Sequence, residues 1–321
     1  MRKYSKIFLY NISLVILLLV LIEVAIRIFS SEIQLTGTSK NIFVDSLYST
    51  TRGLKENSFC ISNGVSKSTN QFHSWKYKRT PSRKNKNLFL GDSVTMGIGV
   101  ENDSTFGGIL NNYFDVINPS LLGYSSFEYI NVFNSFVLEN RYNLEFNAVY
   151  IFWTLNDVYP KTIIQEQPSY KKDNLLYNVI NYLRENSKTY LFLKNTFTDR
   201  SEVYFYFDSK FYYKDSPDLI RSLDDILYIS EKCREMKLDF CVFLLPYEYQ
   251  IRNFGNNDIV KLQEIFSEIL TDNEIKNINC IEAFKDDNTN SRKYFLYGDG
   301  IHFSESGHKK LADYLLKKIN Y

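Results

Sequence analysis

From residue 87 onward, short apolar runs alternate with longer amphipathic segments, and this alternation leaves few folds open to the chain. The run at 148–153 is almost continuously apolar, which is typical of a strand buried on both faces. Strands that alternate with helices form a parallel sheet covered by helices on both sides. The expected strands are 87–90, 115–118, 148–153, 240–245 and 278–281, and the expected helices are 106–113, 126–140, 217–236, 257–270 and 304–319.

An apolar run near the N-terminus predicts a membrane anchor. The uncharged stretch 7–22 would span roughly 24 Å as a helix at ~1.5 Å per residue, slightly less than the ~30 Å hydrocarbon core of a bilayer. Glu23 and Arg27 follow four residues apart, so they can pair on one helix face before the apolar pattern resumes. We therefore expect one membrane-spanning helix over 7–29. The basic residues that precede it are Arg2, Lys3 and Lys6.

Two other interpretations of this run are weaker. A cleaved signal peptide has the same order of charges, but no convincing small-x-small cleavage site follows. A buried helix of a soluble protein would be unusual with apolar residues on every face. Because positive residues favour the cytoplasmic side, we expect everything after residue 29 to be extracytoplasmic. In that compartment a disulfide is permitted, with buried free thiols as the alternative, among Cys60, Cys233, Cys241 and Cys280.

The rest of the chain divides into an extension and a domain. Residues 30–85 are polar and irregular and predict a stalk or extension, with short strand-like pieces at 41–44 and 58–61. Residues 86–321 form the expected catalytic domain, with an insertion at about 159–217. A basic cluster in the extension could touch anionic headgroups, but a solvated charged surface is the simpler interpretation. Its members are Lys78, Arg79, Arg83 and Lys84.

Composition narrows the possible functions. The chain has 44% hydrophobic and 23% charged residues, which is ordinary for a globular domain and excludes disordered and polytopic membrane proteins. Its 38 Lys+Arg against 37 Asp+Glu leave a net charge of +1, so nucleic acid is not an expected partner. The three histidines are scattered and the four cysteines show no CxxC spacing, so we expect no metal site.

A serine and a D-x-x-H sequence stand where nucleophilic chemistry can be built. Ser93 follows the first expected strand of the sheet, and Asp299 and His302 share a loop near the C-terminus. A serine hydroxyl is a poor nucleophile unless a base, itself oriented by a carboxylate, lies within hydrogen-bond reach. His73 lies in the polar extension, and His308 is expected to be a partly exposed structural residue of the last helix. His302 is therefore the preferred base.

Two more residues follow expected strands. Gly123 comes after the second strand of the sheet and Asn156 after the third. A backbone N–H beside an amide side chain can stabilise the oxyanion of a tetrahedral intermediate. Each residue alone also has a structural explanation, Gly123 as a turn and Asn156 as a helix N-cap.

Together, a serine, a glycine, an asparagine and a D-x-x-H in this order resemble the SGNH hydrolases, also called the GDSL esterase/lipase family. The resemblance covers residues from about 87 to 321. It is carried by LFLGDSVTMGIGV over 88–100, with Thr105-Phe106 after it, and by DGIHFSESGH over 299–308. The extension at 45–53 and 69–81 loosely resembles that of membrane-anchored bacterial members.

This resemblance implies a three-layer α/β/α sandwich with a five-stranded parallel sheet in flavodoxin-like order. It implies Ser93 as nucleophile, His302 as general base and Asp299 as the carboxylate that orients His302. The implied oxyanion hole consists of the backbone N–H groups of Ser93 and Gly123 and the side-chain amide of Asn156. Such a mechanism needs no metal and no cofactor.

The chain departs from the family pattern at two positions. Val94 stands where the GDSL name has leucine, which is a mild change on the core side. The third block usually reads G-x-N-D, and here Thr154 replaces the glycine. A β-branched residue at Thr154 is expected to restrict the backbone and narrow the pocket floor, which affects substrate shape more than chemistry.

The expected function is a serine esterase that hydrolyses or transfers a short acyl group, acetyl above all, on a cell-surface carbohydrate, because family members of this architecture often modify bacterial polysaccharides. The aromatic segment 203–207 with 211–213 is expected to form a ring-lined hairpin for sugar stacking or to pack half-buried. A lipase or thioesterase is the enzyme alternative, and an aromatic-walled apolar groove would support it. A non-catalytic anchored glycan-binding or assembly protein is the alternative from another class.

Overall fold

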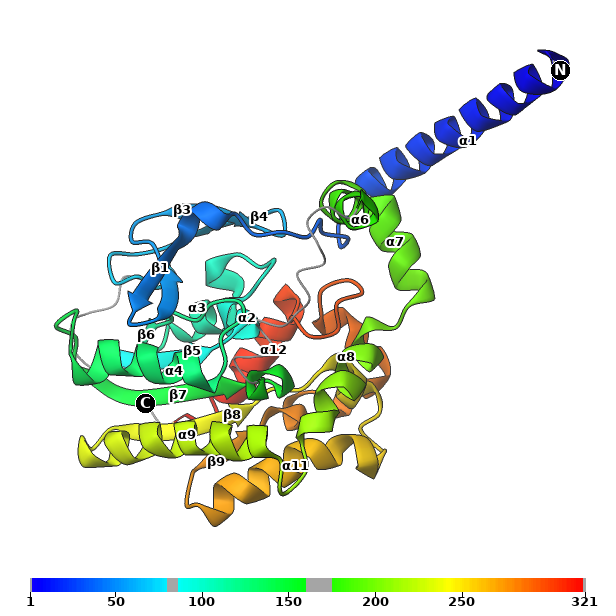
Figure 1. The fold of residues 1–321 in the computed structure, drawn as a ribbon. Helices are drawn as coiled ribbons and strands as arrows, with labels where there is room; N and C mark the ends of the chain where they lie inside the picture. Colours follow the sequence, from blue (N-terminus) through cyan, green and yellow to red (C-terminus); the bar gives the residue numbers. More distant parts are fainter. Residues whose placement is uncertain (1, 80–85, 160–174, 320–321) are drawn as a thin grey trace.

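The structure is a computed structural model that describes residues 2–79, 86–159 and 175–319 (Figure 1). Five parallel strands form its central sheet in the order β6-β5-β7-β8-β9. Numbered from the first strand of this sheet, the order is 2-1-3-4-5, which is the flavodoxin-like order. The predicted fold class is therefore confirmed. The strands are β5 (Lys86–Gly91), β6 (Asp115–Ile117), β7 (Phe146–Trp153), β8 (Asp239–Leu244) and β9 (Asn277–Asn279).

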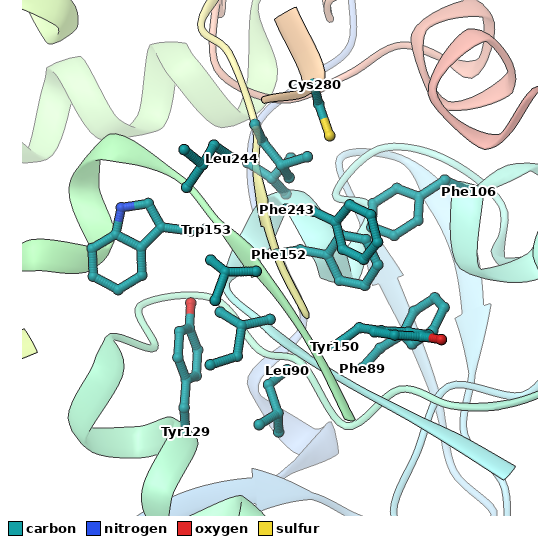
Figure 2. Packing of buried hydrophobic residues seen from close by; sticks show 14 of the residues in the cluster. Phe89, Leu90, Phe106, Tyr129, Tyr150, Phe152, Trp153, Phe243, Leu244 and Cys280 are labelled. Atoms are coloured by element: carbon teal, nitrogen blue, oxygen red, sulfur yellow. The ribbon is translucent and has the colours of Figure 1, made fainter. Parts of the chain in front are cut away.

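Successive residues of a strand point to opposite faces of the sheet. Because both sets of side chains are apolar here, both faces are covered by helices. On one face the ring of Phe152 lies 5.1 Å from that of Phe243 and 4.7 Å from that of Phe106. On the other face Trp153 packs 4.9 Å from Phe266, and Figure 2 shows Tyr129 on this same side. The first face carries α3 (Phe106–Leu110) and α12 (Glu305–Leu315), and the second carries α4 (Ser126–Phe133), α9 (Pro217–Glu235) and α11 (Asn257–Asp272).

The N-terminal extension packs on the domain as two small hairpins. Trp75 fixes it in place, because its backbone N–H donates to Asn118 O at 3.0 Å and its indole N–H donates to Ser120 O at 2.9 Å. Tyr48 and Leu54 are also buried. Of the two expectations, stalk or extension, this packing fits an extension. The hairpins are β1 (Phe43–Tyr48) with β2 (Thr51–Leu54), and β3 (Phe59–Ser62) with β4 (Val65–Ser68).

Only part of the basic cluster lies within the described residues. Arg79 pairs with Asp115 at 2.9 Å, and Lys78 is exposed. Arg83 and Lys84 lie outside the described residues.

The aromatic segment of the insertion is helical, so the predicted hairpin is wrong. Its helix, α8 (Arg200–Asp208), begins where the side chain of Asp199 accepts from the backbone N–H of Glu202 at 3.2 Å. Ser201, Phe205 and Asp208 are buried and spaced four and three apart, which is the period of a helix and not of a strand. Two further helices precede it, α6 (Leu175–Asn186) and α7 (Lys188–Phe197). Residues 160–174 of the insertion lie outside the described residues.

Helix α1 (Arg2–Phe29) extends away from the domain (Figure 1). It contains a stretch, Lys6–Phe29, that is long and apolar enough to cross a membrane and is not buried against the domain. The predicted pair is present, with Arg27 Nε 2.7 Å from Glu23 Oε1. A helix of this kind at the N-terminus also fits a signal sequence.

All four cysteines are buried free thiols. Cys241 lies in β8 as expected, whereas Cys280 follows the end of β9. Burial raises the pKa of Cys233 and Cys241 to about 12, so these thiols are unreactive in the folded protein.

Candidate active site

Ser93 stands at the carboxyl edge of the sheet, where β5 ends and the short helix α2 (Ser93–Met96) begins. Asp92 caps this helix, because its Oδ1 accepts from the Val94 N–H at 2.8 Å. Asp92 is completely buried, while Ser93 is partly exposed. The cap therefore fixes the backbone that presents the Ser93 hydroxyl.

Asp299 and His302 lie on the loop that leads into α12. Asp299 Oδ1 accepts from the backbone N–H of Ile301 at 3.0 Å and of His302 at 2.8 Å, so the carboxylate holds its own loop. Gly300 between them has φ +80°, and a Cβ there would lie 2.3 Å from Cβ of Ser201. This turn therefore requires glycine, and it brings the His302 ring over the edge of the sheet.

The structure brings Ser93, His302 and Asp299 into one hydrogen-bonded chain. His302 Nδ1 lies 2.8 Å from Asp299 Oδ1, and His302 Nε2 lies 2.8 Å from Ser93 Oγ. A carboxylate only accepts, so the hydrogen belongs on Nδ1 and Nε2 is the acceptor for the Ser93 hydroxyl. Residues 209 positions apart thus form the contact that a general base needs.

Charges around His302 favour its protonated form. Burial lowers the pKa of His302, but the charge of Asp299 and its hydrogen bond outweigh burial, so the pKa lies above its ordinary value. Burial raises the pKa of Asp299, and the charge and hydrogen bonds of His302, assisted by Arg200, bring it well below its usual range. Arg200 Nη2 lies 4.0 Å from Asp299 Oδ2. The lowered pKa favours the ionised form of Asp299, whose charge in turn favours the protonated form of His302.

Asn156 also stands at this edge, in the 3₁₀ turn η4 (Leu155–Val158) after β7. Its Oδ1 accepts from Thr154 Oγ1 at 2.6 Å, and its Nδ2 donates to Asp92 Oδ2 at 3.2 Å. An amide nitrogen carries two hydrogens, so one remains for a substrate oxygen. The amide is thus held in one orientation beside Ser93 by its link to Asp92.

The backbone conformation at Thr154 does not require the glycine of the usual G-x-N-D block. Its backbone, with φ −113° and ψ 161°, is in the extended region that β-branched residues favour. The expected restriction of the backbone therefore causes no strain. Its side chain is buried, and its hydroxyl orients Asn156 instead of narrowing the surface of the pocket.

Gly123 lies beside the site, and no hydrogen bond joins it to Ser93 within the described residues. It has φ +77°, and a Cβ at this position would meet no atom within 4 Å. Its neighbour Leu122 lines the same cavity as His302. Within the described residues no acceptor pairs with the Gly123 N–H, so it is available to an incoming oxygen.

Besides Arg200, four further residues at the site carry no prediction from the sequence. Asp92 belongs to the G-D-S triplet itself, and Asp157 follows Asn156 directly. Both stand just after an expected strand, and this position could have marked them as site residues. Burial, followed by the charge of Asp92, raises the pKa of Asp157 well above its usual range. Tyr247 and Asp208 complete the set.

Tyr247 and Asp208 support Asn156 from the far side. The Tyr247 hydroxyl lies 3.1 Å from Asn156 Oδ1 and 2.6 Å from Asp208 Oδ2, and Tyr159 donates to the other oxygen of Asp208. Burial raises the pKa of Asp208 to about 6 despite these bonds. Tyr247 follows β8 and fits the strand-end rule, but nothing in the sequence marks Asp208, which lies on the insertion helix α8.

The other histidines serve structure. His308 is completely buried, so the expectation of a partly exposed residue is wrong; its Nδ1 accepts from the Phe106 N–H at 3.2 Å. Burial lowers the pKa of His308 to about 3, which keeps it neutral. His73 Nδ1 lies 2.7 Å from Leu54 O in the extension. In the part of the chain that the structure describes, no cluster of three or more His, Cys, Asp or Glu side chains is placed to hold a metal.

A cavity of about 540 Å³ opens beside His302 and Asp299. The N-terminal extension supplies most of its wall, so the extension shapes the site. The Arg52 guanidinium lies 4.6 Å from the centre of the Phe43 ring and donates to Leu122 O at 3.2 Å. The wall residues from the extension include Thr36, Thr38, Phe43, Asp45, Arg52 and Asn63.

Fold and site together define an α/β protein with a Ser–His–Asp arrangement at the carboxyl edge of its sheet. No protein-family model matches the chain, and no curated protein matches it. Among solved structures, it is similar to a lipolytic protein of the G-D-S-L family from Desulfitobacterium hafniense, with 16% identity and a TM-score of 0.45 over 73% of this chain and 99% of that one.

Two acetyl xylan esterases are similar to the same degree. AlAXEase has 14% identity and a TM-score of 0.46 over 73% of this chain and 100% of its own. Axe2 from Geobacillus stearothermophilus has 15% identity and a TM-score of 0.45 over 74% and 94%.

Proposed function

We propose that this chain is an SGNH-type serine esterase that removes, or transfers to another hydroxyl, a short acyl group on a cell-surface carbohydrate. The observation that carries the proposal is the pair of 2.8 Å contacts that join Ser93 to His302 and His302 to Asp299. Ser93 is the nucleophile, His302 the general base and Asp299 the carboxylate that orients and charges it. The proposed reaction class, ester hydrolysis, rests on this geometry. The proposed carbohydrate substrate rests on the side chains that line the cavity.

In the proposed reaction, Ser93 Oγ attacks the ester carbonyl carbon while His302 Nε2 takes its proton. The carbonyl oxygen becomes an oxyanion that receives hydrogen bonds from the Ser93 and Gly123 N–H groups and from Asn156 Nδ2. His302 then gives the proton to the departing alcohol, and an acyl-serine remains. Water or another hydroxyl resolves the acyl-serine with the same base. No cofactor is needed for either step.

The lining of the cavity supports a carbohydrate over a long acyl chain. Hydroxyl, amide and charged side chains from Thr38, Asn63 and Arg52 offer hydrogen bonds that sugars use, and Phe43 offers one ring for stacking. A lipase would call for an apolar, aromatic-walled groove. The aromatic segment that could have supplied one forms α8, and its side chains are not among the described residues that line this cavity.

We further propose that α1 anchors the enzyme in a bacterial cell membrane with the catalytic domain outside. The basic residues Arg2, Lys3 and Lys6 would remain on the cytoplasmic side. This location would present the site to the glycans and lipids of the cell surface.

Ester chain length tests the acyl group. The full-length protein in detergent micelles, given p-nitrophenyl acetate, butyrate and octanoate, is expected to release nitrophenol fastest from acetate. Polar side chains interrupt the apolar lining that Phe43, Ile98 and Leu122 supply to the cavity, and an acetyl group needs little apolar surface. Rates that rise with chain length would contradict the short-acyl proposal and favour the lipase. Absence of turnover on all three esters, with and without an added oligosaccharide acceptor, would contradict the enzyme proposal.

Asn156→Ala is expected to reduce kcat by roughly 10²–10³-fold, because one donor to the oxyanion is lost. Tyr247→Phe is the matched comparison, since it removes one hydroxyl that supports the Asn156 amide and leaves its N–H groups in place. The measurement is kcat on p-nitrophenyl acetate, with circular dichroism to show that both variants fold. Equal losses in the two variants would mean that Asn156 acts through structure alone.

A further inference from the structure

Helices α6 and α7 carry apolar side chains that the described residues leave exposed. Tyr182 on α6 is 66% exposed and Phe197 on α7 is 83% exposed. Val179 lies three residues before Tyr182, and Leu193 lies four residues before Phe197, so each helix bears one apolar stripe. Exposed apolar surface that is gathered on neighbouring elements marks a binding face more often than chance exposure.

The corner between α6 and α7 is bound to the end of α1. Glu23 accepts from the Thr189 N–H at 2.8 Å, the Lys188 N–H at 3.1 Å and the Ser187 hydroxyl at 3.0 Å, so it caps the start of α7. Arg27 donates to Asn186 O at 2.7 Å. Glu23 and Arg27 are the two charged residues of the stretch 7–29, and both meet this corner. These contacts therefore hold the corner at one position along the axis of α1, beside its last turns.

The two helices cross the direction of α1. Figure 1 shows α6 nearly end-on at the base of α1, and α7 running away from the same point. A bilayer crossed by α1 would therefore pass along the sides of α6 and α7. Their charges suit its surface, because residues 175–197 contain three basic side chains and one acidic one, namely Arg184, Lys188, Lys194 and Glu185.

We propose that α6 and α7 lie in the interface of the bilayer that α1 crosses, with their apolar stripes against the acyl chains. The occupant of this face is thus lipid, and the inference rests on the membrane anchor proposed above. Helices of this kind lie about 5–10 Å into the boundary between headgroups and acyl chains. The insertion then seats the domain on the membrane in addition to anchoring it.

This position of α6 and α7 in the interface also sets the distance of the catalytic cavity from the membrane surface. The Thr36 hydroxyl donates to Arg184 O of α6 at 3.4 Å, and Thr36 lines the cavity that contains His302. The cavity wall is therefore tied to the helix that we place at the membrane. An acylated glycan held close to the membrane would meet the site without a further search in solution.

Site-directed fluorescence in vesicles tests the seating. The full-length protein carries one added cysteine labelled with the environment-sensitive dye NBD, at Leu17→Cys in α1, Val179→Cys in α6, Leu193→Cys in α7 or Met236→Cys after α9. The four native thiols are buried, and α9 lies on the side of the molecule away from α1 (Figure 1). Proteins are reconstituted in phosphatidylcholine/phosphatidylglycerol vesicles with or without lipids that bear a doxyl quencher on the acyl chain. Circular dichroism checks each variant.

Strong doxyl quenching is expected at Leu17, Val179 and Leu193, several-fold above that at Met236. Quenching at Leu17 alone would overturn the seating and leave the anchor intact. Blue-shifted but unquenched dye at Val179 and Leu193 would mean that protein covers the face, which also overturns the proposal. Quenching equally strong at Met236 would show non-specific adsorption and overturn it too. No quenching at Leu17 would refute the anchor itself, together with the seating, while leaving esterase activity a separate question.

Discussion

Ser93→Ala is expected to lower kcat on p-nitrophenyl acetate by about 10⁶-fold, the largest effect of any single change in this protein. Without Oγ no acyl-enzyme forms, and His302 has no proton to take. The oxyanion donors and the cavity remain, so a small residual rate over the uncatalysed reaction is expected. A burst of nitrophenol in the wild type and its absence in the variant would locate the loss at acylation.

The matched control for this change is Ser104→Ala, which removes a serine hydroxyl from an exposed contact with Glu305. It is expected to keep wild-type activity. Should Ser93→Ala keep its rate, or keep the biological phenotype of the wild type, the catalytic assignment would be refuted in favour of a binding or assembly role.

Asp299→Asn is expected to lower kcat by roughly 10³–10⁴-fold, because the amide no longer fixes the Nδ1–H tautomer or stabilises the imidazolium. It should also change the pH profile. His302 acts as a base only when neutral, so wild-type activity is present above its raised pKa and is lost as pH falls through it. Removal of the Asp299 charge lowers that pKa, so the acid limb of kcat/KM should move to lower pH in the variant.

Arg200→Ala gives the opposite sign and is the control for this argument. The Arg200 charge lowers the pKa of His302, so its loss should move the acid limb of kcat/KM to higher pH with a much smaller fall in kcat. A pH profile that moves in the same direction for both variants would contradict the electrostatic account of His302.

The insertion brings two side chains to the candidate site from positions that no motif marks. Asp208 and Arg200 lie on α8, one behind the Asn156 amide through Tyr247 and the other beside Asp299. The alternation of its aromatic residues over a few positions predicts a strand, either in a ring-lined hairpin or packed half-buried, and the structure has a helix instead. The helix forms because Asp199 caps it and because a period of three to four buries Phe205 and Asp208 together.

The sequence alone determined the sheet and the order of the candidate site residues, and it selected His302 as the proposed base. Apolar runs between helical segments leave a parallel sheet as the simplest way to bury both faces of each strand, and polar residues after those strands must meet at its carboxyl edge. Ser93, Asn156, Asp299 and His302 were selected in this way, and the structure places Ser93, His302 and Asp299 in one hydrogen-bonded chain. The sequence analysis did not predict the capping of α8 by Asp199 or the unstrained backbone at Thr154.

Only the tertiary structure decided what surrounds these residues. Side chains such as Asp208, Tyr247 and Thr36 reach the site from segments far away in sequence, and local patterns carry no information about such distances. The depth of His308 likewise depends on the helices that close over it. The contact of Glu23 with the start of α7 joins residues 166 positions apart. The apolar pattern of α1 contains no information about such a contact.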